Sequence, residues 1–283
     1  MQISDILELI KAAPTASVKL NRYGYEVNGE RYRRVTTLLG GIPKAWLGAW
    51  SAKMVAHYAV EHRESWEKLP KNDAIKLLKS SPWGKRDKAG DRGTAVHNAI
   101  EAYLNKVDIP EMNEDETACA EAASTFLKER GSKILGAEVT VFNVTHSYAG
   151  TLDVWEQRPD GKLGILDWKT SGAIHAEHAI QQVAYQRAEF AIVKKEKVGD
   201  GEWLGKIIPW AGMADVLGVV HVEATGATLH SIPEDTERLW NVFRASSYIK
   251  DWQLATDSFA GRTPREHVYI QNPTVLPLKG DKK

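Results

Sequence analysis

The sequence of 283 residues contains a single cysteine, Cys119. One thiol cannot form a disulfide within the chain, and it cannot supply the four cysteine ligands of an iron–sulfur cluster. We therefore expect a protein of a reducing compartment that has no iron–sulfur cluster of its own.

Long hydrophobic runs are also missing. No apolar run approaches the roughly 18 to 20 residues that a membrane-spanning helix requires. The first residues, MQISDILELIKAAP, are too acidic and too weakly apolar to resemble a signal peptide. We expect a cytoplasmic protein without a membrane partner.

The chain lacks an excess of charge of either sign, because 37 Lys and Arg residues balance 37 Asp and Glu residues. Net charge therefore does not indicate a polyanionic partner, and any nucleic-acid binding must depend on local basic patches. Hydrophobic residues make up 43% of the chain. That share is enough for one large domain, or for one domain with an appended lobe.

The N-terminal part of the chain predicts a short helix, a β-hairpin and three further helices. Asn28-Gly29, a pair favoured in two-residue turns, separates RYGYEV from RYRRV and predicts the hairpin. Segment 44–62, rich in tryptophan, is expected to be helical. Segment 90–106 has apolar residues at the spacing of an amphipathic helix, and the next helix is expected to end near Gly131.

The remainder predicts a mixed sheet flanked by helices, an α/β or α+β fold. A strand, helix, strand crossover implies one parallel pair beside an antiparallel meander. The expected elements are strands at 137–144, 149–156 and 162–170, a helix at 175–195, an irregular stretch at 199–212, strands at 216–224 and 227–232, and a helix opened by Pro233.

Residues 150–171, GTLDVWEQRPDGKLGILDWKTS, combine two apolar strands with charged residues near their ends. Asp167 and Lys169 follow the apolar run LGIL, and the period of a strand places both on one face. Asp153 lies at the corresponding depth of the preceding strand. Gly150 precedes it, and its missing side chain would let a backbone or a phosphate approach closely.

Two carboxylates on adjacent strands repel each other unless a positive charge lies between them. Mg²⁺ or Mn²⁺ held by Asp153 and Asp167 would supply that charge. Lys169 would then hold the attacking water and stabilise charge developing on phosphorus. The Asp-x-Lys pattern also begins at Asp160 and Asp281. On these residues alone, aspartates that face solvent at strand ends explain the pattern equally well.

Two helical segments add polar residues to this pattern. His97 lies at the margin of an apolar helix face, where it could become a nitrogen ligand, and Glu101 follows one turn later to orient it. Gln181 and Tyr185 are four residues apart and project from one helix face. Taken singly, a structural histidine and a polar helix face account for these residues as well.

In chain order, these motifs resemble those of the RecB-like nucleases. This branch of the PD-(D/E)xK superfamily includes the CRISPR adaptation exonucleases and many phage exonucleases. The resemblance covers residues 90–224 and implies a core of helix, three strands, helix and strand. The motifs that carry it are His97, Gly150-Thr-Leu-Asp153, Asp167-Trp-Lys169, and Gln181 with Tyr185.

The resemblance also implies roles for individual residues. His97, Asp153 and Asp167 would bind Mg²⁺ or Mn²⁺, with the backbone carbonyl of Trp168 as a further ligand. Lys169 would be the catalytic lysine. The supporting helix pair would be Gln181 and Tyr185, and Glu138 stands where many relatives have an acidic residue.

The function implied is a metal-dependent DNA exonuclease of phage or bacterial recombination, replication or DNA-end processing. If phage-encoded, it would act in the host cytoplasm. Many relatives hold an iron–sulfur cluster that this chain cannot ligate. No G-x-x-x-x-G-K-[ST] loop occurs in the sequence, so a helicase or recombinase partner would be a separate chain.

A basic stretch precedes the segment of His97. Aromatic rings beside basic residues suit linear or single-stranded DNA ends, because bases stack on rings while cations follow the backbone. Solvated lysines and core tryptophans are the alternative explanation. The candidate DNA contacts are Lys85, Arg86, Lys88 and Arg92.

On this basis the chain divides into three parts. Residues 1–89 would form a hairpin and a tryptophan-rich helical lobe that contacts DNA, residues 90–258 the nuclease core, and residues 259–283 a weakly ordered tail. Two alternatives remain open: an endonuclease on the same core, and a catalytically silent DNA-binding module.

Overall fold

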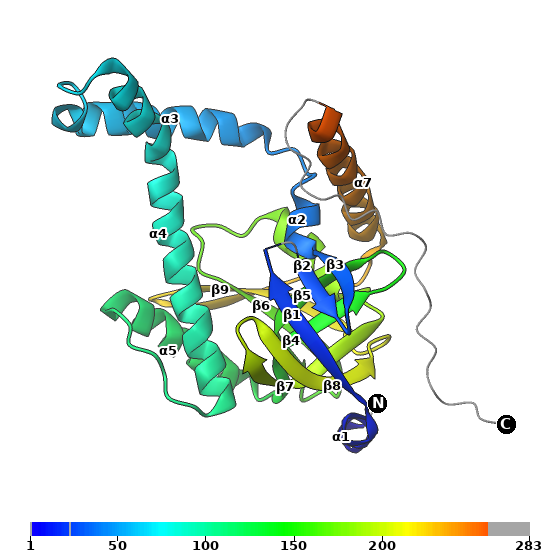
Figure 1. Cartoon of the computed structure of the whole chain (residues 1–283). Helices are drawn as coiled ribbons and strands as arrows, with labels where there is room; N and C mark the ends of the chain where they lie inside the picture. The colour runs from blue at the N-terminus through cyan, green and yellow to red at the C-terminus, as the bar shows by residue number, and fades with distance from the viewer. Residues whose placement is uncertain (1, 23, 260–283) are drawn as a thin grey trace.

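The fold is a mixed α+β arrangement in which helices flank a curved sheet (Figure 1). The computed structural model describes residues 2–22 and 24–259, without the side chains of residues 85–89 and 254–259. The expected weakly ordered tail therefore lies, from residue 260, outside the described residues. No helix in the described part of the chain has both the length and the apolar character needed to cross a membrane.

Helices occupy the N-terminal half, the crossover after the meander and the C-terminal end. They are α1 (Ile3–Ala12), α2 (Val35–Leu39), α3 (Ala45–Glu61), the 3-10 helix η1 (Arg63–Ser65), α4 (Lys71–Asn105), α5 (Glu114–Arg130), α6 (Ala176–Gln186) and α7 (Glu237–Phe259). The helices predicted from the N-terminal sequence are confirmed. In α5, for example, the Asn113 side chain accepts a hydrogen bond from Glu116 N at the start, and Gly131, with φ of 65°, ends the helix.

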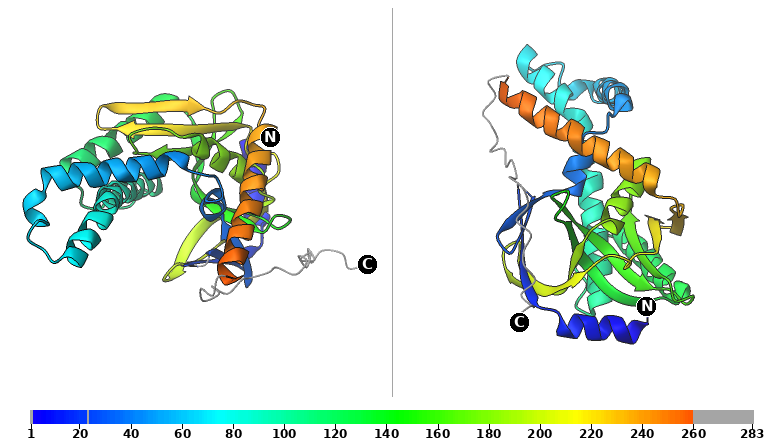
Figure 2. Two further views of the ribbon diagram at one scale, coloured as in Figure 1. Left: turned by 90° about the horizontal axis from the view of Figure 1, so that it is seen from above. Right: turned by 90° about the vertical axis from the view of Figure 1, so that its right-hand side faces the viewer.

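Helix α4 is much longer than the predicted segment 90–106. It runs for 35 residues and includes Pro82 in its first half. The boundary placed at residue 89 falls inside this helix. Together with α3, the first half of α4 projects away from the sheet, as the views in Figures 1 and 2 agree.

Ten strands of the described chain form one continuous sheet. They are β1 (Thr15–Asn21), β2 (Gly24–Val27), β3 (Glu30–Arg34), β4 (Lys133–Asn143), β5 (Tyr148–Gln157), β6 (Leu163–Lys169), β7 (Phe190–Gly199), β8 (Glu202–Pro209), β9 (Val216–Glu223) and β10 (Gly226–Ser231). The β2–β3 hairpin turns at Asn28-Gly29 as predicted, since both residues have positive φ. The parallel pairing of β6 with β9 confirms the mixed sheet.

The sheet closes on itself at one end, which the sequence did not predict. Strands follow in the order β5, β3, β2, β1, β8, β7 and β4, and pairing of β4 with β5 completes a seven-stranded ring. Strands β6, β9 and β10 extend from β5 as an open sheet. The N-terminal hairpin is therefore part of the ring.

Strand β5 is the junction between the ring and the open sheet. Its first residues, Tyr148 and Ala149, pair with β3, whereas Val154 to Gln157 pair with β6. In the described pairings, Gly150, Thr151 and Leu152 have no partner on that edge and pair only with β4. One edge of β5 thus changes its partner from β3 to β6 just before Val154. We call this point the fork in the sheet.

Two further predictions were wrong, and both concern the ring. The predicted helix 175–195 ends at Gln186, and β7 begins at Phe190. Aromatic and β-branched residues favour a strand there, and β7 pairs with β4 on one side and β8 on the other. The stretch 199–212, predicted to be irregular, contains β8, which pairs with β7 and β1.

Helices cover both faces of the open sheet. On one face, Ile180 and Val183 of α6 pack in a core cluster with Ile165 of β6. On the other, Val96 of α4 and residues of α5 pack with Trp168. Alternate residues of β6 thus enter different cores, and the end of this strand lies between α4 and α6.

Candidate metal centre

Three possible metal ligands meet beside the fork in the sheet. His97 comes from α4, Glu138 from β4 and Asp153 from β5, and their donor atoms all lie within 4.8 Å of one another. Asp153 is buried, and the other two are half-buried. Within residues 2–22 and 24–259, no other His, Cys, Asp or Glu residues form such a group of three.

The orientation of His97 is set by a backbone hydrogen bond. Its Nε2 lies 2.9 Å from the carbonyl oxygen of Trp168, and its Nδ1 lies 3.6 Å from Oδ2 of Asp153. A carbonyl oxygen only accepts hydrogen bonds, so Nε2 carries the hydrogen and donates it. In the neutral ring, Nδ1 then presents its lone pair towards the carboxylates. Histidine ligands of metals are typically oriented in this way.

Asp153 is held by the neighbouring strand. The backbone N–H of Trp168 donates a hydrogen bond of 2.7 Å to its Oδ2. Trp168 therefore orients both His97 and Asp153, through its carbonyl and its amide. The sequence indicated the Trp168 carbonyl as a metal ligand, but in this structure that oxygen accepts the hydrogen bond of His97.

Glu138 has an unusual backbone conformation. Its φ is 50°, in the left-handed region that residues other than glycine rarely adopt. It lies opposite Asp153 in the β4–β5 ladder, since the residues on either side of it pair across from the neighbours of Asp153. Such a conformation persists only where the surrounding structure holds it, and it is common at functional sites.

Asp167 and Lys169 form an ion pair at the end of β6. Both side chains lie on one face of the strand, as the sequence predicted. Gln181 Nε2 lies 3.5 Å from Oδ1 of Asp167 and donates a hydrogen bond of 2.7 Å to the Tyr185 hydroxyl. Gln181 therefore connects the Tyr185 hydroxyl to the Asp167 carboxylate. Asp167 itself is not in the group of three donors.

The cluster concentrates negative charge in a poorly solvated place. Burial, and then the charges of Asp153 and Glu101, raise the pKa of Glu138 to about 8. Burial also raises the pKa of Asp153, although the nearby His97 opposes this. A divalent cation would relieve the same repulsion, so the donors fit a hard metal ion such as Mg²⁺ or Mn²⁺.

Lys169 remains positively charged beside these carboxylates. Its burial acts to lower its pKa, but the charges of Asp167 and Asp153 outweigh that effect, and its pKa is raised. A half-buried ammonium group beside carboxylates can stabilise negative charge that develops on a nearby substrate.

Gly150 lets the side chain of Tyr185 lie close to the backbone of β5. A Cβ atom at this position would lie 2.3 Å from Cε1 of Tyr185. The close neighbour is therefore the Tyr185 ring, which packs on the bare backbone of β5, and not the backbone or phosphate expected from the sequence. Tyr185 in turn accepts the hydrogen bond of Gln181.

Of the four candidate DNA contacts, only Arg92 has a side chain that the structure describes. Lys85, Arg86 and Lys88 belong to α4, but their side chains lie outside the described residues. Arg92 forms an ion pair of 2.8 Å with Asp115 and donates a hydrogen bond to Sγ of Cys119. These contacts join α4 to α5, so Arg92 is engaged within the protein.

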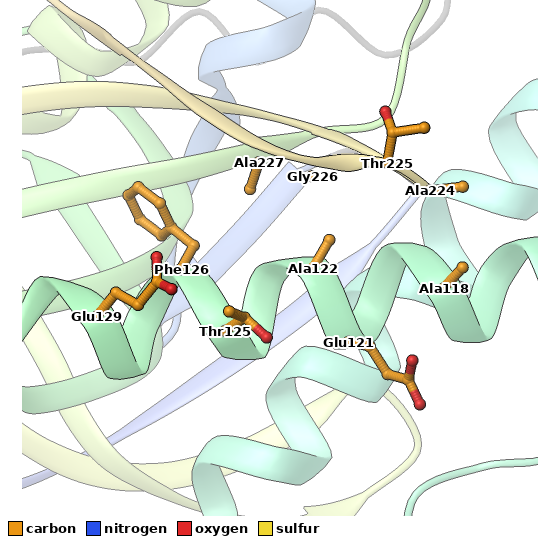
Figure 3. A pocket seen from close by; sticks show the side chains of 10 residues that line it. All are labelled: Ala118, Glu121, Ala122, Thr125, Phe126, Glu129, Ala224, Thr225, Gly226 and Ala227. Atoms are coloured by element: carbon orange, nitrogen blue, oxygen red, sulfur yellow. The ribbon is translucent and has the colours of Figure 1, made fainter.

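A shallow pocket lies between α5 and the turn that joins β9 to β10 (Figure 3). Small residues and the acidic side chains of Glu121 and Glu129 line it. None of the three clustered metal donors, and neither Asp167 nor Lys169, borders this pocket. The pocket is therefore separate from the group of three donors.

No protein-family model matches the sequence, and no curated protein matches it. Any assignment of function therefore depends on the residues and geometry described above.

Proposed function

We propose that this chain is a metal-dependent DNA exonuclease of the RecB-like kind. The observation that carries the proposal is the juxtaposition of His97, Glu138 and Asp153 with the ion pair of the buried Asp167 and the half-buried Lys169. Metal donors with a nearby lysine suit the hydrolysis of a phosphodiester bond.

The order of elements around the cluster supports a PD-(D/E)xK core. Helix α4, strands β4 to β6, helix α6 and strand β9 occur in the helix, three strands, helix and strand order of that superfamily, with α5 inserted after α4 and with β7 and β8 inserted before β9. The closed ring formed with β1, β2, β3, β7 and β8 is additional to that core.

In this proposal His97, Glu138 and Asp153 hold the cation. When bound, Mg²⁺ or Mn²⁺ would lower the pKa of a coordinated water and stabilise charge on the phosphate. Lys169 stabilises the charge that develops on the phosphate oxygens. Asp167 orients Lys169, and its assignment as a further metal ligand stays a prediction, because its carboxylate is paired with that lysine.

Gln181 and Tyr185 complete the support of the site. Gln181 lies between the Asp167 carboxylate and the Tyr185 hydroxyl, and Tyr185 packs against Gly150 of β5. The pair thus links α6 to β5 and β6, the strands that carry Asp153 and Asp167. We propose that these residues position Asp167 without taking part in the chemistry.

Digestion of end-labelled DNA tests this function. Linear duplex, single-stranded and covalently closed circular DNA are incubated with the protein in Mg²⁺, and in EDTA. We expect Mg²⁺-dependent shortening of linear DNA from its ends, with the circle intact. Cleavage of the closed circle would instead favour an endonuclease. Binding without cleavage of any DNA would indicate a silent module.

The matched variants are Asp167→Asn and Asp160→Asn. Both aspartates begin an Asp-x-Lys sequence, but Asp160 lies in the β5–β6 turn, where it pairs with Arg158. Asp167→Asn should abolish cleavage while circular dichroism remains unchanged, and Asp160→Asn should retain cleavage. Full activity of Asp167→Asn would overturn the site assignment.

A further inference from the structure

A stacked ring pair lies where α3 begins. The rings of Trp46 and His175 are nearly parallel, at 15°, with centroids 6.1 Å apart. Trp46 is the second residue of α3, and His175 immediately precedes α6. The Trp46 side chain is nevertheless 53% exposed, so much of its surface remains open to solvent.

The position of Trp46 is not explained by core packing. None of the 17 residues of α3 is buried, and this helix projects from the body of the protein (Figure 1). Its start is tied to α6 by an ion pair of 2.9 Å between Lys44 and Glu177. The ring is therefore held over His175 by contacts at the start of the helix, while about half of the residue stays accessible to solvent.

Helix α6 connects this ring pair to the candidate metal centre. His175, His178, Gln181 and Tyr185 recur at intervals of three or four residues, which places them along one side of the helix. The rings of His175 and His178 are 5.7 Å apart, and Gln181 reaches Asp167. From residue 175 to 181 a helix rises about 9 Å, so the ring pair lies about that far along the helix from the residue that reaches Asp167.

We propose that Trp46 and His175 form a stacking subsite for an unpaired nucleobase of a single-stranded DNA end. The inference rests on the proposed nuclease function, because it places the base next to the phosphate that would be cleaved. An open aromatic face binds any base, since every base has a π face. Bases inside a duplex are stacked on both sides, so the subsite selects an unpaired end.

The test measures binding of short single-stranded oligonucleotides to the Asp167→Asn protein, which should bind without cleaving. Trp46→Ala should weaken binding by roughly 5- to 150-fold, the range for loss of one base–aromatic stack. Trp46→Phe should restore most of the affinity. The control is Tyr58→Ala, because Tyr58 also contacts a histidine ring, His62, but near the other end of α3.

Abasic oligonucleotides separate stacking from a general structural effect. A single abasic nucleotide is moved stepwise from the labelled end. At one position the abasic nucleotide should weaken binding to the protein that retains Trp46. With that oligonucleotide, the protein that retains Trp46 and the Trp46→Ala variant should have the same affinity. The subsite would be overturned if Trp46→Ala lowered the affinity equally for every oligonucleotide, wherever the abasic nucleotide lies. It would also be overturned if Trp46→Ala did not lower the affinity at all.

The nuclease function and the subsite can fail separately. If the unmodified protein neither binds nor cleaves DNA, the proposed function is wrong and the subsite falls with it. If the unmodified protein cleaves DNA and Trp46→Ala binds oligonucleotides with unchanged affinity, only the subsite is wrong.

Discussion

Glu138 and Asp153 face each other across two strands, and one of them takes up a proton readily. With a pKa of about 8, Glu138 is largely protonated in the metal-free protein at neutral pH. A divalent cation would displace that proton, because metal ligands bind as carboxylates. Metal binding should therefore release protons and tighten as the pH rises.

Replacing Glu138 tests its role directly. Glu138→Gln preserves the shape of the side chain but removes the charge, so Mn²⁺ affinity should fall by at least roughly 10-fold. Glu121→Gln is the control, because Glu121 lines the separate pocket beside α5 and lies outside the group of three donors. Titration calorimetry with Mn²⁺ measures both. Equal effects of the two variants would remove Glu138 from the ligand set.

Lys169 has a different expected signature. Lys169→Ala should lower the cleavage rate by several orders of magnitude, because the lysine acts on the transition state. Its loss also leaves the buried Asp167 without its cation partner, so Mn²⁺ affinity should be unchanged or higher. Single-turnover cleavage and metal titration measure the two effects. A matching loss of metal affinity would make Lys169 a structural residue.

Among the elements, α6 and β5 depend on a glycine for their contact. Gly150→Ala would place a methyl group in the Tyr185 ring, and the strain should cost about 1–3 kcal/mol. Displacement of Tyr185 should also lower cleavage through Gln181. Thermal unfolding and cleavage rates measure the two consequences.

Gly48→Ala in α3 is the matched control. A Cβ atom at Gly48 meets nothing within 4 Å, and the residue is exposed within a helix. Alanine there should stabilise the helix by about 1 kcal/mol. If Gly150→Ala, like Gly48→Ala, did not lower the thermal stability of the protein, the Tyr185 ring would be free to move away from the added methyl group.

Strands β7 and β8 show why the sequence predicted a longer helix and an irregular stretch in their place. The alanine-rich helix pattern continues past Gln186, and only pairing with β4 and β8 turns the following residues into a strand. Asp200-Gly201, a pair typical of hairpin turns, joins β7 to β8, and Gly201 has φ of 63°. That pair is the sequence signal that could have predicted β8.

For the whole molecule, positive and negative charges are equal in number, so the path of DNA must depend on local groups of basic residues. Lys85, Arg86 and Lys88 lie in the projecting half of α4. If they contact phosphates, replacing all three with alanine should weaken DNA binding and reduce the slope of log affinity against log salt by roughly 0.7 to 0.9 for each lost contact.

This effect should be the same for all DNA sequences, because phosphate contacts do not read bases. Thermal stability should stay nearly constant, since exposed charges contribute little to folding. Affinity and salt slope are measured by fluorescence anisotropy. If the triple variant keeps both values of the unmodified protein, the DNA path does not include this stretch.

The sequence by itself determined the local features of the protein. Period-two and helical spacing predicted the meander, the parallel pair and most helices, and they put Asp167 and Lys169 on one strand face. The resemblance of its motifs to those of RecB-like nucleases implied that His97 and Asp153 lie close together, and the structure confirms that contact. These properties depend on neighbours within a few residues, or on motifs in a fixed order.

Only the tertiary structure decided what depends on distant partners. Ring closure joins β1 to β8 across most of the chain, and nothing in the local pattern of either strand specifies that pairing. Glu138 joins the group of three donors at a position where its backbone is left-handed and faces Asp153 across the ladder. Trp46 reaches His175 because α3 and α6 are tied together at their starts. Each contact arises from long-range packing, which local periodicity does not encode.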